Sequence, residues 1–212
     1  MAKLRTVNGE RFALLLSERR IMIRVKQLAR RISRDYRGSV PVLIGVLNGS
    51  FIFFSDLVRE LSIPCEIDFL KLSSYGDAKI SSGNVRLLKD LNCTVEGHDI
   101  IVVEDIVDSG LSMEYIRELV GSHQPRSLRM VTLLYKPESV RSALVPEYVG
   151  FSIPPEFVIG YGLDYAQRER NLRAIYRRVP PGGSPELERG LVRIGATRVR
   201  AKNIEQTVQA QS

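Results

Sequence analysis

The sequence predicts an α/β fold with a mostly parallel sheet that is flanked by helices. Continuous apolar runs such as residues 41–47 and 100–103 are typical of strands that are covered on both faces. Segments with helical spacing of apolar residues lie between such runs, as at 18–36 and 112–121. Strands that alternate with helices form βαβ units, which place the carboxyl ends of the parallel strands at one edge of the sheet.

The expected elements follow one another in regular alternation. The first helix begins after Ser17, a suitable N-cap, and keeps Val25, Leu28 and Ile32 at helical spacing. The turn residues Asn48-Gly49-Ser50 separate the first apolar run from the second helix. We expect helices at 18–36, 51–62 and 112–121. We expect strands at 41–47, 65–72, 85–91, 98–105, 128–136, 148–151 and 157–161, with a polar loop at 73–84.

The composition fits one domain with an appendage. Hydrophobic residues make up 44% of the 212 residues, which is enough for one core. We place the domain at 1–179 and a basic, mobile tail at 180–212, because the segment that starts at Pro180 is rich in Pro and Gly and ends in a Gln-rich stretch. Neither a secretory signal nor an apolar run of about 20 residues is recognisable, so a cytoplasmic location is expected.

The net charge of +7 is concentrated at the N-terminus. Residues 1–40 hold eleven Lys and Arg and three acids, a balance of +8. This region either attracts polyanions or forms the solvated face of a basic helix. Cys65 and Cys93 are expected to be reduced, and His98 and His123 have no partner at the spacing of a zinc site.

The run at 100–112, IIVVEDIVDSGLS, joins a buried strand to a helix through a short polar loop. The strand ends in Glu104 and Asp105, and Asp108 follows after two apolar residues. In open α/β sheets, ligands bind at the carboxyl ends of strands, and the N-terminus of a helix favours a bound phosphate. The segment VVEDIVDSGLS closely resembles the signature of the phosphoribosyltransferases, which bind phosphoribosyl pyrophosphate.

Transfer at a sugar carbon that carries pyrophosphate requires help with the charge of the leaving group. Mg²⁺ can bridge ribose hydroxyls and pyrophosphate. We assign to Glu104 and Asp105 contacts with the ribose hydroxyls or with metal-bound water, because Mg²⁺ takes few protein ligands and keeps several waters. The alternative is that both are solvated acids at the end of a strand.

Asp108 is the candidate general base for the proton on a purine ring nitrogen, a role that typically contributes ~10²–10⁴-fold to the rate. Its alternative role is that of a helix N-cap. The hydroxyls of Ser109 and Ser112, with the backbone N–H groups from Asp108 through Ser112, can cradle a dianionic 5′-phosphate. Gly110 allows the backbone to approach it closely.

Three further segments resemble one branch of the phosphoribosyltransferases. Residues 157–172, FVIGYGLDYAQRERNL, look like the C-terminal motif of the hypoxanthine-guanine phosphoribosyltransferases. Residues 46–61 are similar to the pyrophosphate-loop region of that family, and residues 69–76 resemble the start of its mobile catalytic loop. The resemblance covers about residues 10–178, in the family's order. It implies the type I phosphoribosyltransferase fold, with a small hood built from N- and C-terminal segments.

The resemblance also implies roles for individual residues. Phe157 would stack on the purine, and the backbone of Val158 would bond its edge. Lys136 would donate to the exocyclic 6-oxygen and so select oxopurines over aminopurines, although outside this context it reads as a surface lysine. Asp164 would organise a second Mg²⁺ through water beside the purine, and Arg170 would bind pyrophosphate.

The resemblance also implies a lid over the sugar and a turn that binds pyrophosphate, and the turn departs from the family pattern at one residue. Ser74 and Tyr75 would lead a lid that excludes water from the sugar, the alternative being an ordinary hairpin loop. Asn48 and Gly49 would bind pyrophosphate, but some family members carry Lys in place of Asn48. This difference shifts binding onto backbone N–H groups and Arg170. The family often has a non-proline cis peptide at this turn.

These features together predict a magnesium-dependent purine salvage enzyme. It would transfer the 5-phosphoribosyl group from phosphoribosyl pyrophosphate to hypoxanthine and/or guanine, giving IMP or GMP and pyrophosphate. The family implies a homodimer or homotetramer, and we expect no membrane or nucleic-acid partner. The alternatives are the same chemistry on xanthine or uracil, a regulatory RNA-binding protein that uses the basic N-terminal region or the tail, and an inactive scaffold.

Overall fold

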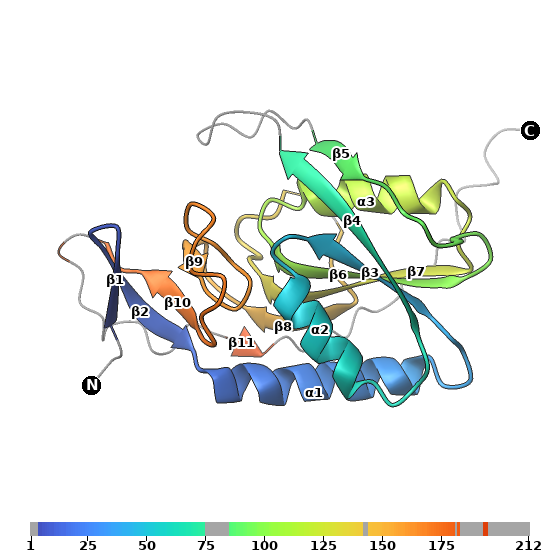
Figure 1. Cartoon of the computed structure of the whole chain (residues 1–212), viewed down its shortest axis with the longest axis horizontal. Helices are drawn as coiled ribbons and strands as arrows, with labels where there is room; N and C mark the ends of the chain where they lie inside the picture. The colour runs from blue at the N-terminus through green and yellow to red at the C-terminus, as the bar shows by residue number, and fades with distance from the viewer. Residues whose placement is uncertain (1–3, 75–84, 142–143, 181, 183–192, 195–212) are drawn as a thin grey trace, which may run out of the picture.

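A seven-stranded sheet forms the centre of the computed structural model, which describes residues 4–74, 85–141, 144–180, 182 and 193–194 (Figure 1). The strand order is β11-β8-β7-β6-β3-β4-β5. The five strands from β8 to β4 pair in parallel, and the edge strands β5 and β11 are antiparallel to their neighbours. The bounds are β3 Val42–Leu47, β4 Glu66–Ser74, β5 Val85–Lys89, β6 Asp99–Val107, β7 Ser127–Tyr135, β8 Tyr148–Ser152 and β11 Arg193–Ile194. The predicted mostly parallel sheet is confirmed.

Helices cover both faces of this sheet. Helices α1 (Glu18–Asp35) and α2 (Phe51–Glu60) pack on one face, and α3 (Leu111–Gly121) packs on the other (Figure 1). The Ser17 hydroxyl accepts the backbone N–H of Arg20 at 3.4 Å, so the predicted N-cap of α1 is confirmed. Val25, Leu28 and Ile32 are buried in the core, as their spacing predicts. Within the described residues, no helix combines the length and the apolarity that a membrane crossing requires.

A second, four-stranded sheet lies beside the first and forms the expected hood (Figure 1). Its order is β1-β2-β10-β9, with bounds β1 Leu4–Val7, β2 Glu10–Leu16, β9 Val158–Ile159 and β10 Ile175–Arg178. The strands β1, β2 and β10 are absent from the sequence-based expectation. Asn8 and Gly9 both have positive φ and join β1 to β2 in a two-residue turn, a combination typical of a type I′ hairpin.

The segment 180–212 contributes one described strand to the main sheet. Arg193–Ile194 form the edge strand β11, which pairs with β8. The sequence predicts a tail outside the core for this whole segment, and this pair of residues departs from that expectation. The other residues of the segment, apart from Pro180 and Gly182, lie outside the described part of the chain.

The strand order changes direction at β3. This strand pairs with β4 on one side and with β6 on the other. Such a topological switch point leaves a crevice outside the carboxyl ends of the two neighbouring strands, where ligands of open α/β sheets bind. The turn at residues 48–50 follows β3, and the loop at 108–110 follows β6, so both lie at this edge.

Candidate active site

A pocket of about 330 Å³ opens at this edge of the sheet. It brings together residues from the turn after β3, the end of β6, the residue after β7, and the hood. Its lining residues are Asn48, Gly49, Asp105, Ile106, Asp108, Lys136, Phe157, Val158, Leu163, Asp164 and Arg170. The sequence predicts all of these as site residues except Ile106 and Leu163.

The turn after β3 comes very close to the carboxylate of Asp105. A Cβ atom added to Gly49 would lie 1.9 Å from Asp105 Oδ2, so this position requires glycine. The buried Ser50 hydroxyl donates to the carbonyl of Val46 at 2.6 Å and closes the turn. The peptide bond between Leu47 and Asn48 is cis, in agreement with the family trait.

Two neighbouring carboxyl groups, Glu104 and Asp105, lie near the end of β6. Glu104 is only 8% exposed and does not line the pocket, whereas Asp105 does. Burial, followed by the negative charge of Asp105, raises the pKa of Glu104 well above its usual value. Burial also raises the pKa of Asp105 to about 6, while the Arg170 guanidinium acts to lower it. The pair is therefore a place where added positive charge is favourable.

The loop after β6 leads directly into helix α3. Gly110 precedes α3 with φ +88°, and the Ser109 hydroxyl accepts the N–H of Leu111 at 3.4 Å. The N–H groups of the first turn of a helix have no intrahelical acceptor. Ser109, Gly110, Leu111 and Ser112 do not line the pocket themselves, but they directly follow Asp108, which does.

Asp108 and Lys136 form an ion pair inside the pocket. Lys136 Nζ lies 2.5 Å from Asp108 Oδ2. The lysine side chain is only 8% exposed and the aspartate side chain is 57% exposed. The backbone N–H of Lys136 donates to Val107 O at 3.0 Å, which fixes the residue after β7 beside the end of β6. An ammonium has three donors, so Lys136 can hold Asp108 and a further acceptor at the same time.

Aromatic rings form the wall contributed by the hood. Phe157 is 41% exposed, and its ring centroid lies 5.8 Å from that of Tyr165 and 6.4 Å from that of Phe12. The guanidinium of Arg178 lies 5.7 Å from the Phe157 centroid. Val158 is buried and pairs with Arg177 in the hood sheet. The packed rings hold Phe157 in place while a large part of its surface stays accessible to a planar ligand.

Arg170 is held within the hood loop, residues 160–174, which joins β9 to β10. Its guanidinium donates to the carbonyl of Gly162 at 2.8 Å and pairs with Asp164 at 2.9 Å. Asp164 also accepts the backbone N–H of Gln167 at 2.9 Å. A Cβ atom on Gly162 would lie 2.1 Å from the carbonyl oxygen of Gly49, so the two backbones are in direct contact.

The remaining predicted groups are placed as follows. Ser74 is the last residue of β4, and Tyr75 lies outside the described residues, so the lid stays a prediction.

Cys65 and Cys93 are free thiols, as expected. Among the described side chains, no cluster of three or more His, Cys, Asp or Glu is placed to hold a metal ion. Sequence reasoning missed Ile106 and Leu163, whose only signal is their position beside predicted site residues.

Comparison with known proteins agrees with the resemblance found in the sequence. Residues 14–166 match the phosphoribosyl transferase domain. The hypoxanthine-guanine phosphoribosyltransferase of Bacillus subtilis is 44% identical over 158 residues, which are 74% of this chain and 88% of that protein. The bifunctional protein TilS/HprT of Listeria innocua is also 44% identical, but the chain spans only 24% of its length.

A solved structure agrees with the fold. The hypoxanthine-guanine phosphoribosyltransferase of Bacillus anthracis, with a HEPES molecule in its active site, superposes with a TM-score of 0.75 at 42% identity. The match covers 82% of this chain and 99% of that one. The chain therefore belongs to the phosphoribosyltransferase family, among the hypoxanthine-guanine phosphoribosyltransferases.

Proposed function

We propose that this protein transfers the 5-phosphoribosyl group from phosphoribosyl pyrophosphate to hypoxanthine and/or guanine. The observation that carries the proposal is the buried Lys136 ammonium, paired with Asp108 in the same pocket as the accessible ring of Phe157. A cation matches the 6-oxygen of these bases, whereas it is mismatched with the amino group of adenine. The names of the relatives support the same reaction.

The pocket offers a place for each part of phosphoribosyl pyrophosphate. The 5′-phosphate binds the loop from Asp108 to Ser112 and the N-terminus of α3. The pyrophosphate binds the turn at Asn48 and Gly49 and the guanidinium of Arg170, which line one side of the pocket. The ribose then lies over Glu104 and Asp105, between these two anion sites.

The residues fit a requirement for Mg²⁺. Glu104 and Asp105 are neighbouring carboxyl groups with raised pKa values, and Asp164 lines the same pocket as Asp105. Mg²⁺ is commonly held by one or two carboxylates plus substrate phosphates, so a larger protein cluster is not needed. When bound, the ion neutralises charge on the pyrophosphate leaving group.

The chain's own residues then handle the base. Phe157 stacks on the purine, and the Val158 backbone bonds its edge. Lys136 donates to the 6-oxygen while it keeps its contact with Asp108. A ring nitrogen of the purine forms the new bond to the sugar carbon, the bond to pyrophosphate breaks, and Asp108 accepts the ring proton. Ser74 and Tyr75 lead the lid that keeps water from the activated sugar.

The proposal extends to the setting of the enzyme. We place it in purine salvage in the cytoplasm, as a homodimer or homotetramer, on the basis of the family resemblance. Analytical ultracentrifugation of the full chain gives the assembly directly. A monomer at micromolar concentration would contradict the assembly but not the reaction.

The test of the reaction is product identification. The protein is incubated with phosphoribosyl pyrophosphate, Mg²⁺ and hypoxanthine or guanine, and the mononucleotide is separated by chromatography. We expect IMP or GMP with an equal amount of pyrophosphate. Lys26→Gln is a suitable control, because Lys26 pairs with Glu60 and neither residue lines the pocket. Absence of both mononucleotides would overturn the proposal.

A further inference from the structure

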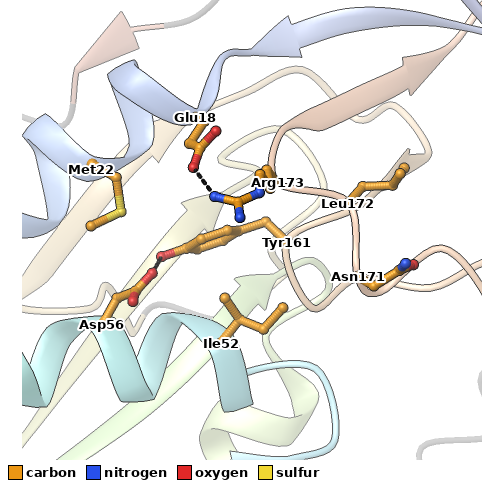
Figure 2. A pocket seen from close by; sticks show the side chains of 8 residues that line it. All are labelled: Glu18, Met22, Ile52, Asp56, Tyr161, Asn171, Leu172 and Arg173. Carbon is orange, nitrogen blue, oxygen red and sulfur yellow. Dashed lines mark hydrogen bonds and ion pairs between the residues drawn. The ribbon is translucent and has the colours of Figure 1, made fainter.

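A second pocket lies between the hood loop and the two helices on one face of the sheet. It has a volume of about 280 Å³ and is lined by Met22 of α1, Ile52 and Asp56 of α2, and Tyr161 and Leu172 of the hood loop, among others. Figure 2 shows the Tyr161 side chain extending to Asp56, and its hydroxyl donates to Asp56 Oδ2 at 2.6 Å. This hydrogen bond ties the hood loop to α2.

The backbone around Tyr161 is held in a sparsely populated conformation. Tyr161 has φ +54° and stands between Gly160 at +95° and Gly162 at +101°. An aromatic residue adopts this region only where its surroundings determine it. The Tyr161 N–H donates to the carbonyl of Leu172 at 2.8 Å, and the side chain is buried. Burial, with the adjacent carboxylate of Asp56, raises the pKa of Tyr161, so its hydroxyl remains a donor.

The next residue of the same loop touches the first pocket. Gly162 packs against the carbonyl of Gly49, and its own carbonyl accepts the Arg170 guanidinium at 2.8 Å. Helix α2, which carries Asp56, begins two residues after Gly49. The turn and the loop that carry Gly49 and Arg170 are therefore joined twice, once by the Gly49–Gly162 contact and once by the Asp56–Tyr161 bond behind it.

We propose that Asp56 and Tyr161 are a positioning pair for the pyrophosphate half of the active site. Their hydrogen bond fixes the Gly49 turn relative to Arg170, and neither side chain lines the pocket in which the reaction takes place. This inference rests on the proposed function. A small displacement between anion-binding groups is costly, because a misplacement of about 1 Å can reduce a rate ~10²-fold.

The first test is Tyr161→Phe, which keeps the ring and removes the hydrogen bond. We expect the KM for phosphoribosyl pyrophosphate and the Kd for Mg²⁺–pyrophosphate to rise about tenfold, part of the loss that misplaced groups can cause. We expect the KM for hypoxanthine to change less than twofold, because Lys136 and Phe157 lie outside the hydrogen-bonded loop. A loss confined to one substrate is not the signature of general destabilisation.

Variants of Asp56, the hydrogen-bond partner of Tyr161, provide a rescue variant and a second test. Asp56→Asn keeps an acceptor and should stay within about twofold of wild type, whereas Asp56→Ala should repeat the loss. The double variant Asp56→Ala/Tyr161→Phe should be no worse than either single variant, as expected for residues that act as one unit. Arg173→Gln is the matched control, because it breaks an exposed ion pair with Glu18 in the same pocket (Figure 2) and should change neither constant.

Two results would overturn the inference. One is an unchanged KM for phosphoribosyl pyrophosphate in Tyr161→Phe or in Asp56→Ala. The other is an equal loss for both substrates together with a lower Tm, which is what a purely structural bond would give. If Tyr161→Phe does not fold, the comparison of Asp56→Asn with Asp56→Ala decides. A wild-type protein without turnover would overturn the proposed function, and this inference with it.

Discussion

Lys136→Gln is the substitution that most directly probes base recognition. The change removes the cation that lies 2.5 Å from Asp108 and leaves a neutral amide in the pocket. We expect weaker turnover of hypoxanthine and a smaller preference for hypoxanthine over adenine. The protein should still fold, because the partner that loses its cation, Asp108, is 57% exposed and remains solvated.

The size of the effect follows from the kind of bond that is lost. A hydrogen bond that involves a charged group contributes about 1.5–3 kcal/mol. Since about 1.4 kcal/mol corresponds to a tenfold change in rate, kcat/KM for hypoxanthine should fall roughly 10- to 150-fold. The side chain of Lys136 is only 8% exposed, so the upper half of this range is the better expectation.

The assay is steady-state release of pyrophosphate with hypoxanthine and with adenine. Wild type, Lys136→Gln and the surface control Lys26→Gln are measured in parallel, with Tm values to show that each is folded. An unchanged kcat/KM for hypoxanthine in Lys136→Gln would refute the assignment of this lysine. A drop in Lys26→Gln of the same size would refute the claim that the effect is local.

Three further outcomes are expected. Asp108→Asn should fold and lower kcat about 10²-fold or more, since general-base help contributes ~10²–10⁴-fold, and near-wild-type turnover would exclude that role. Gly49→Ala should raise the KM for phosphoribosyl pyrophosphate, because the new Cβ would lie 1.9 Å from Asp105 Oδ2 and must displace that carboxylate. Steady-state kinetics measures the change, a melting curve shows whether the variant is folded, and an unchanged KM would contradict the role of this turn. Hydrogen bonds from Arg126 lower the pKa of Asp99 to about 2. The unfolded state therefore binds more protons between about pH 4 and 2, and Asp99 stabilises the fold above this range. Wild type should exceed Asp99→Asn by about 1–2 kcal/mol in urea unfolding at pH 7, by less at pH 3, and a gap that does not depend on pH would contradict this.

The sequence predicts the central sheet well because its signals are local. The apolar runs and the helical spacing at residues 18–36 and 112–121 correspond to elements of the structure within a few residues. The pocket is also largely predicted, because parallel strands place Asn48, Asp108 and Lys136 at one edge. Side-chain contacts could not be predicted in this way. The direct pairing of Lys136 with Asp108 depends on packing that no local sequence pattern encodes.

The hood could not be predicted from local sequence patterns, because its contacts join segments that are far apart in the chain. Strand β10 pairs with β2 although the two lie at opposite ends of the domain, and Asp56 bonds to Tyr161 across 105 positions. Such non-local partners carry no periodic signal. The Asn8-Gly9 turn is different, because Asn-Gly between apolar segments is a strong hairpin signal and was present in the sequence.

The most direct test of the central claim is a parallel panel of bases. Release of pyrophosphate from phosphoribosyl pyrophosphate and Mg²⁺ is measured with hypoxanthine, guanine, xanthine, adenine and uracil. We expect turnover with hypoxanthine or guanine and none with adenine. Turnover with adenine or uracil alone would contradict the role of Lys136. Absence of turnover with every base would contradict the enzymatic function and favour RNA binding by the basic N-terminal region or the tail.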